Sequence, residues 1–203
     1  QAFVPYLKKG DKIYESACGL GMNLYATLEI VQEESGVTDI TVYGNEYLAE
    51  NVPRAMELLE SLLDHQPGVG AVRNHVGTIC PGNSADLSFV PSNTFDLVFT
   101  GYITPLLDPL NWNETSTRSY DARMKKLCQG AADGNQTDQQ QVAIMQERQE
   151  AWFSNWVQQM IRIAKPGAPV IVEEIAPPAC DKLTDWGGVD KSFWQEGHQR
   201  YGW

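Results

Sequence analysis

The sequence predicts an α/β fold in which a doubly wound, mostly parallel sheet carries helices on both faces. Three observations predict it. Buried strand patterns alternate with amphipathic helix patterns, the run 95–100 is mostly apolar, and a turn of small residues separates the first strand from the first helix. The chain has 203 residues, of which 42% are hydrophobic, enough for one good core. We therefore expect a single domain over residues 1–203.

Hydrophobic spacing defines the first half of the fold. Apolar residues recur at helical spacing over 22–34 and 48–63, whereas residues 39–43 are β-branched and short, which is typical of a strand. The run His65-Gln66-Pro67-Gly68 ends the second helix. The predicted elements are, in order, a strand at 12–16, a helix at 22–34, a strand at 39–43, a helix at 48–63 and a strand at 71–79.

The second half contains one long interruption. Residues 101–138 are rich in Pro, Asn, Gly, Asp and Thr, and we expect them to form a lid-like insertion. Helical spacing then continues to the run Lys165-Pro166-Gly167, which stops a helix. The predicted elements here are a turn-rich segment at 83–94, a strand at 95–100, a helix at 137–164, a strand at 169–174 and a helical stretch at 191–198.

The charge of the chain argues against some partners. A formal net charge of −11 repels nucleic-acid phosphates and anionic lipid. No apolar run approaches the ~20 residues of a membrane span, and the N-terminal residues do not resemble a signal peptide. We expect a soluble, cytoplasmic protein whose partners include neither nucleic acid nor a membrane.

The spacing of the cysteines and the presence of two sequons bear on the cellular compartment. Cys18, Cys80, Cys128 and Cys180 are scattered singly, so we expect no metal site and no disulfide framework, but reduced thiols. Two N-glycosylation sequons begin at Asn113 and Asn135. Because such triplets occur by chance in most chains of this length, we take them as coincidental.

The segment from Tyr14 to Gly21 is the most informative motif. It ends a strand with the acidic residue Glu15, then turns through small residues into a helix whose N-terminal N–H groups favour a ligand. The carboxylate of Glu15 would repel a pyrophosphate and attract an ammonium group. Glu46 follows the second strand, 25 residues after Gly21, near the spacing at which a carboxylate accepts hydrogen bonds from a ribose diol. Ligands of such sheets bind at the carboxyl ends of the strands.

Together these motifs resemble the class I S-adenosylmethionine-dependent methyltransferases, a Rossmann-like family, and the resemblance covers residues 10–175. The turn after Glu15 resembles the family's glycine-rich first motif, with Ala17 in place of the usual first glycine. The segments 82–87 and 93–98 resemble the part that holds the adenine, with Asn83 where the family usually has aspartate, and Asp86 as an alternative. Residues 162–167 resemble the family's turn before the fifth strand.

The resemblance implies S-adenosyl-L-methionine as the cofactor. The positions that it assigns to cofactor binding are Glu15, Ala17, Cys18, Gly19, Gly21, Asn23, Glu46, Tyr47, Asn83, Ser84 and Thr100. Tyr102 and Glu173, at the ends of the fourth and fifth strands, are the candidate catalytic residues. They would lie near a methyl acceptor, which we expect to be a small molecule that reacts at sulfur, nitrogen or oxygen.

Two alternatives remain open. In the first, the chain keeps the methyltransferase-like fold as a cofactor-binding or scaffold subunit, and catalysis is lost or supplied by a partner. We expect the family's antiparallel strands after the fifth strand to be missing here: either the sequence is a fragment of a longer protein, or this edge of the sheet is lost, which would support that alternative. A nicotinamide oxidoreductase is disfavoured, because Glu15 would face a pyrophosphate and Leu24 stands where that fingerprint has its third glycine. The sequence predicts neither the acceptor nor the oligomeric state.

Overall fold

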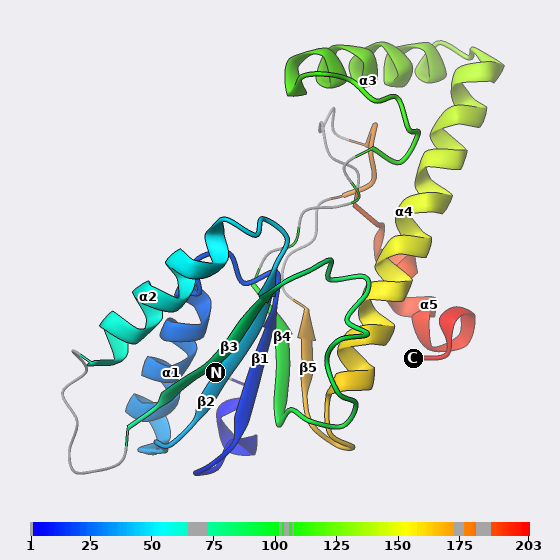
Figure 1. Cartoon of the computed structure of the whole chain (residues 1–203). Coiled ribbons are helices and arrows are strands. Elements are labelled where there is room, and N and C mark those ends of the chain that lie inside the picture. The colour runs from blue at the N-terminus through cyan, green and yellow to red at the C-terminus, as the bar shows by residue number, and fades with distance from the viewer. Residues whose placement is uncertain are drawn as a thin grey trace. The chain divides into compact units, whose positions relative to one another are not determined.

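The computed structural model describes residues 2–64, 73–101, 103, 106, 108–172, 177–181 and 188–203. Figure 1 shows the chain, which divides into two compact units: unit 1 holds 1–103 and 156–174, and unit 2 holds 104–155 and 175–203. The elements are η1 (Val4–Tyr6), β1 (Lys12–Ser16), α1 (Met22–Ser35), β2 (Thr41–Glu46), α2 (Asn51–Asp64), β3 (His75–Pro81), β4 (Leu97–Thr100), α3 (Thr117–Ala132), α4 (Gln136–Ile163), β5 (Val170–Val172) and α5 (Lys191–Tyr201).

The sheet of unit 1 confirms the predicted fold class. Its five strands are ordered β3-β2-β1-β4-β5, and every pair is parallel. The order reverses between β1 and β4, the place at which open α/β sheets bind ligands. The strand β1 and the helix α1 begin at the predicted residues, 12 and 22.

Helices cover both faces of this sheet (Figure 1). On β1, Ile13 packs in the core that Leu24, Leu28 and Leu59 of α1 and α2 share. The alternate residue Ser16 accepts a hydrogen bond from Trp156 Nε1 at 3.0 Å, so the unit 1 part of α4 lies on the opposite face. Right-handed crossovers on either side of β1 require this two-faced arrangement.

Unit 2 contains a helix that the sequence did not predict. Residues 117–132 lie inside the segment expected to be a lid without regular structure, yet they form α3. The helix is mostly polar and is preceded and followed by turn-forming residues, so its composition resembles that of a loop. Its start is set by Ser116, whose side chain accepts a hydrogen bond from the N–H of Ser119.

The core of unit 2 contains a disulfide. Cys128 of α3 is bonded to Cys180, 52 residues later, with 5.1 Å between the two Cα atoms. Tyr120, Met124, Leu127 and Met145 bury their side chains around it. The prediction of four reduced cysteines is therefore wrong for this pair, because partners so far apart in sequence leave no spacing signal. Cys18 and Cys80 are free thiols.

No helix among the described residues is both long and apolar enough to cross a bilayer.

Candidate functional site

Two acidic side chains lie at the carboxyl ends of adjacent strands. Glu15 is the penultimate residue of β1, and Glu46 is the last residue of β2. In the parallel register, Ser16 pairs with Asn45, so the two glutamates leave the sheet at the same edge. Both are buried: Glu15 is 0% exposed and Glu46 is 8% exposed. Buried carboxylates are costly unless they are hydrogen-bonded or face a cation, so their positions need an explanation.

The turn between β1 and α1 has the geometry that a glycine-rich loop adopts. Ala17, Gly19 and Gly21 have φ angles of 57°, 55° and 81°, all in the left-handed region. Gly21 precedes α1 without a side-chain cap, and a Cβ there would lie 2.6 Å from Leu59 Cδ1. Only glycine fits at that position. A Cβ at Gly19, in contrast, would meet nothing within 4 Å, so the backbone there is open to approach by a ligand.

Glu46 holds this turn in place. Its Oε2 accepts a hydrogen bond from the N–H of Gly19, and its Oε1 accepts one from the N–H of Leu48, both at 3.0 Å. A carboxylate has about four lone-pair sites, so each oxygen retains one for a further donor. Glu46 thus joins the turn after β1 to the turn after β2 and keeps acceptor capacity for a ligand.

Glu15 is held by a residue of α1. Asn23 Nδ2 donates a hydrogen bond to Glu15 Oε1 at 2.9 Å. Gly101, which directly follows β4, leaves the space that Asn23 fills: a Cβ on Gly101 would lie 2.1 Å from Asn23 Nδ2. The structure therefore brings together Glu15, Asn23 and Gly101. The sequence places the segment 100–102 at this edge, but the close contact between Gly101 and Asn23 was not predicted, although a glycine directly after a buried strand is a signal for a close approach.

The sequence places Asn45 beside Glu46 at the end of the second strand, but it predicts no contact for the Asn45 side chain. It is 0% exposed, accepts a hydrogen bond from Tyr14 Oη at 3.0 Å, and donates to Ser84 Oγ at 3.0 Å and to the carbonyl of Gly82 at 3.1 Å. It therefore fixes the turn after β3 to β1 and β2. A buried polar residue directly before an acidic strand end was the available signal.

Three predicted cofactor contacts differ in their surroundings. Ser84 is buried and bonded to Asn45, whereas Asn83 is exposed, and its Oδ1 accepts a hydrogen bond from the N–H of Ala85. Thr100 is 1% exposed and donates its hydroxyl to the carbonyl of Ser16 at 2.8 Å. That bond joins β4 to β1, so the Thr100 side chain supports the sheet at this edge.

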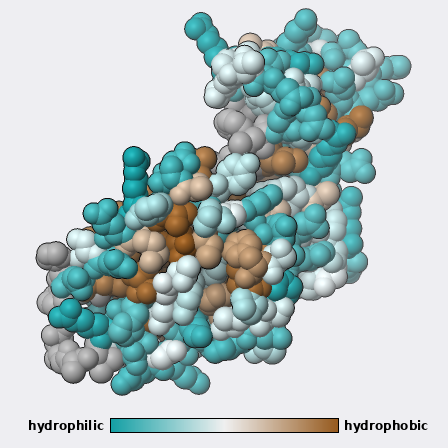
Figure 2. Space-filling view, in the orientation of Figure 1, coloured by the Kyte–Doolittle hydropathy of each residue, from teal (hydrophilic) through white to brown (hydrophobic). Residues whose placement is uncertain are grey.

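Apolar side chains are exposed around the same strand ends. They follow β1, β2 and β3 in turn: Leu20 and Met22, then Tyr47 and Leu48, then Phe89. Tyr47 is 67% exposed, which is unusual for a large aromatic side chain. Figure 2 shows apolar, brown side chains gathered over the sheet of unit 1. Exposed apolar groups beside buried carboxylates are typical of a ligand site with a few placed polar contacts.

Cys18 contributes backbone and packing rather than a reactive thiol. Burial raises the pKa of this thiol, and the negative charges of Glu15 and Glu46 raise the pKa further. A raised pKa keeps the thiol protonated at neutral pH, and a protonated thiol is a poor nucleophile. The Cys18 N–H donates to the carbonyl of Asn45 at 2.9 Å, which adds another bond between β2 and the turn.

The candidate catalytic residues Tyr102 and Glu173 lie outside the described residues. Their predicted roles stay predictions.

The first site prediction concerns the strained turn. Ala17→Gly should stabilise the protein by about 0.5–1 kcal/mol, because alanine at positive φ costs about 1–2 kcal/mol and glycine loses part of that gain in chain entropy. Urea titration measures the free energy of unfolding. Ala26→Gly, at an exposed position of α1, is the matched control and should destabilise by about 1 kcal/mol. An equal loss of unfolding free energy in both variants would show that the backbone at Ala17 is not strained.

A second prediction tests the Gly101 contact. Gly101→Ala should displace Asn23 from Glu15 and weaken binding of S-adenosylhomocysteine about 10-fold, the worth of one hydrogen bond to a charged group. In an Asn23→Ala background, the same change should cost nothing further, since all three atoms nearest the added Cβ belong to Asn23. Isothermal titration calorimetry on the wild type, the two single variants and the double variant completes this double-mutant cycle. Additive losses would show that Gly101 acts by another route.

We compared the chain with known protein families, sequences and structures. No family model matches the chain, and no curated protein sequence matches it. Among solved structures, the chain is similar to geranyl diphosphate C-methyltransferase from Streptomyces coelicolor A3(2), which was solved in complex with Mg²⁺, geranyl-S-thiolodiphosphate and S-adenosyl-L-homocysteine. The TM-score is 0.52 and the sequence identity is 10%, over 98% of this chain and 54% of that one. The DszA carbon methyltransferase is similar at a TM-score of 0.52 and 10% identity, over 98% and 43%.

A SAM-dependent methyltransferase from Aquifex aeolicus is similar over 90% of this chain and 69% of that one, at 15% identity and a TM-score of 0.44. The chain spans about half the length of the first two structures, 54% and 43%. At such identities, the likeness concerns the fold alone. With its strand order and its turn between β1 and α1, the chain has the fold of the class I S-adenosylmethionine-dependent methyltransferases.

Proposed function

We propose that the protein is an S-adenosylmethionine-dependent methyltransferase that acts on a small molecule. One observation carries the proposal: two buried carboxylates, Glu15 and Glu46, leave adjacent strands beside a turn whose backbone is open at Gly19. A dinucleotide pyrophosphate would be repelled there. A ligand with an ammonium group at one end and a ribose diol at the other suits both carboxylates.

The residues at this site fit the cofactor. Glu15 is buried and accepts a hydrogen bond from the neutral amide of Asn23, and its carboxylate is a suitable partner for an ammonium group. Glu46 keeps acceptor sites for two ribose hydroxyls. The exposed apolar residues after β2 and β3, Tyr47, Leu48 and Phe89, offer a surface for adenine.

S-adenosylmethionine, when bound, supplies an electrophilic methyl group on a sulfonium centre. The protein then has to orient the cofactor and the acceptor rather than perform the chemistry itself. Glu15 and the turn would fix the amino-acid end, and Glu46 would fix the ribose. We propose a small acceptor with a sulfur, nitrogen or oxygen nucleophile because the net charge of −11 opposes nucleic-acid substrates.

Calorimetric titration tests the proposal. S-adenosylmethionine and S-adenosylhomocysteine should bind, whereas NAD should not. Glu46→Ala should weaken binding by about 1–3 kcal/mol, because it removes charged hydrogen-bond acceptors from the ribose and from the turn. Affinity for S-adenosylhomocysteine that is unchanged by Glu46→Ala would contradict the ribose assignment. No binding by the full-length protein would refute the whole proposal.

A second candidate is a cofactor-binding or scaffold subunit without activity. Cofactor binding together with no methyl transfer, in a screen of small sulfur, nitrogen and oxygen nucleophiles, would favour it. Methyl transfer to any of these acceptors would exclude it.

A further inference from the structure

The disulfide of unit 2 places a constraint on where the chain folds. Cys128 is buried in the unit 2 core, and its bond to Cys180 closes a stretch of 52 residues. Structural disulfides form and persist in oxidising compartments and are rare where glutathione and thioredoxin keep thiols reduced. A cytoplasmic location would keep thiols reduced, and the disulfide between Cys128 and Cys180 is therefore an argument against that expectation.

Both sequons lie in the same unit as the disulfide, and they flank the helix that carries Cys128. Asn113-Glu114-Thr115 directly precedes the Ser116 cap of α3. In Asn135-Gln136-Thr137, Asn135 directly precedes α4, and Gln136 and Thr137 are the first two residues of that helix. Asn113 and Asn135 are both exposed. N-linked glycans need such surface positions, because the sugar is bulky and solvated.

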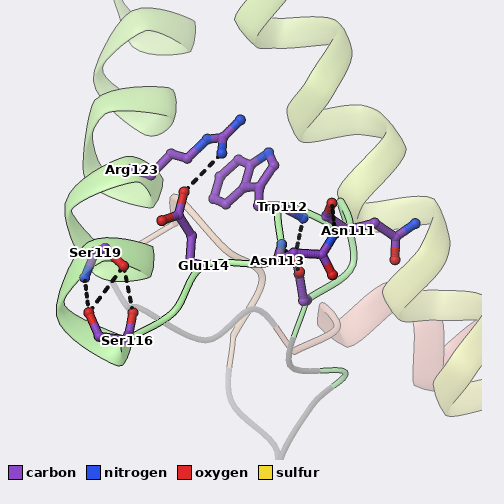
Figure 3. A network of polar contacts seen from close by, with 8 residues as sticks. Asn111, Trp112, Asn113, Glu114, Ser116, Ser119 and Arg123 are labelled. Atoms are coloured by element: carbon purple, nitrogen blue, oxygen red, sulfur yellow. Dashed lines mark hydrogen bonds and ion pairs between the residues drawn. The ribbon is translucent and has the colours of Figure 1, made fainter.

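The loop at Asn113 suits a glycan (Figure 3). The N–H of Asn113 donates to Asp108 Oδ2 at 2.8 Å, and its side-chain Nδ2 donates to the carbonyl of Asn111 at 3.0 Å. An amide nitrogen carries two hydrogens, so a glycosylated Asn113 keeps one for Asn111.

The base of this loop is held by its neighbours. The guanidinium of Arg123 pairs with Glu114 at 2.9 Å and lies 4.5 Å from the ring centroid of Trp112. The pair and the ring anchor the backbone on both sides of Asn113, whose side chain is exposed. A glycan at Asn113 therefore displaces no described contact.

Asn135 can be modified without loss of its structural role. Its Oδ1 accepts hydrogen bonds from the N–H of Thr137 at 3.0 Å and from the N–H of Asp138 at 3.3 Å, so it caps α4. N-glycosylation leaves the amide oxygen unchanged. Among the described residues, none accepts a hydrogen bond from Asn135 Nδ2, the atom to which the sugar is attached.

We propose that Asn113 and Asn135 carry N-linked glycans and that the chain folds in an oxidising secretory compartment. In each glycosylation, Nδ2 forms a bond to C1 of an oligosaccharide carried on a lipid pyrophosphate. The bond between C1 and the pyrophosphate oxygen breaks, and the amide loses one proton. Cys128 and Cys180 lose two electrons and two protons to the disulfide of an oxidoreductase, which becomes a dithiol.

The test uses the full-length protein from the cells that make it, detected with an antibody and without an added secretion signal. Peptide N-glycosidase F should increase its gel mobility in a step that corresponds to two glycans. Digestion in ¹⁸O water should convert Asn113 and Asn135 to ¹⁸O-labelled aspartate, as read by mass spectrometry. Peptides with both asparagines unmodified before digestion would overturn the proposal, and modification at one alone would overturn it for the other.

Matched variants keep the assignment specific. Expressed in the same cells, Thr115→Ala and Thr137→Ala should each remove one glycan, whereas Thr115→Ser and Thr137→Ser should retain it. Alkylation before reduction should leave Cys128 and Cys180 unlabelled and joined in one peptide. Alkylation of both thiols in the native cell extract would overturn the oxidising compartment. None of these results depends on cofactor binding, so they can fail or succeed separately from the proposed function.

Discussion

Glu15→Gln should weaken binding of S-adenosylhomocysteine about 10- to 100-fold, the effect of losing charge-assisted hydrogen bonds worth about 1.5–3 kcal/mol. The substitution is close to isosteric at a residue that is 0% exposed, and a glutamine oxygen can still accept from Asn23 Nδ2. It therefore removes the negative charge while it preserves the packing. Calorimetry with S-adenosylhomocysteine measures the change, and S-adenosylmethionine should show the same loss.

The control is Glu29→Gln, the same chemical change at an exposed position of α1. It should leave affinity within about twofold, because an exposed charge is screened by solvent and salt. Thermal unfolding of both variants shows whether the fold is intact. A folded Glu15→Gln protein with wild-type affinity would remove Glu15 from the site.

Trp156→Ala should reduce the free energy of unfolding by about 3–5 kcal/mol, the usual cost of a large cavity in a core. The Trp156 side chain is 0% exposed, and its Nε1 donates to Ser16 Oγ at 3.0 Å. The substitution removes the ring and leaves a buried hydroxyl at the end of β1 without this partner. For a domain of this size the melting temperature should fall by about 6–20 °C.

Two variants separate packing from hydrogen bonding. Trp156→Phe keeps a six-membered aromatic ring and loses the pyrrole ring with its N–H, so it should cost about 1–3 kcal/mol, less than Trp156→Ala. Trp152→Ala, at a half-buried position one helical turn earlier, should cost less than Trp156→Ala. A Trp156→Ala protein as stable as the Trp152→Ala protein would show that this face of the sheet does not depend on α4.

The fold class could be predicted because the strands of a parallel sheet and the helices beside them carry strong patterns. Glu15 and Glu46 could be placed at one edge because the carboxyl ends of parallel strands coincide. In contrast, α3 was missed because its polar composition, between segments rich in turn-forming residues, resembles that of a loop. Its disulfide was missed because two cysteines 52 residues apart become neighbours only in three dimensions.

Within the site, too, features that are local in sequence were predicted, and contacts between residues far apart in sequence were not. The glycine-rich turn was predicted, since its small residues are local in sequence. The contacts of Asn45 and Gly101 depend on residues at sequence separations of 31 or more and on free space around an atom, which no local spacing reveals. Sequence motifs therefore identified the edge of the sheet, and tertiary contacts identified the residues that shape it.

Glu46 has one further consequence for ligand capture. Because it already clamps the N–H groups of Gly19 and Leu48, the loop is shaped while the chain folds, before any ligand arrives. The conformational entropy of ordering this loop is then lost during folding and is not subtracted from the association free energy. The cofactor would then bind to a preorganised loop, without an induced closure of that loop.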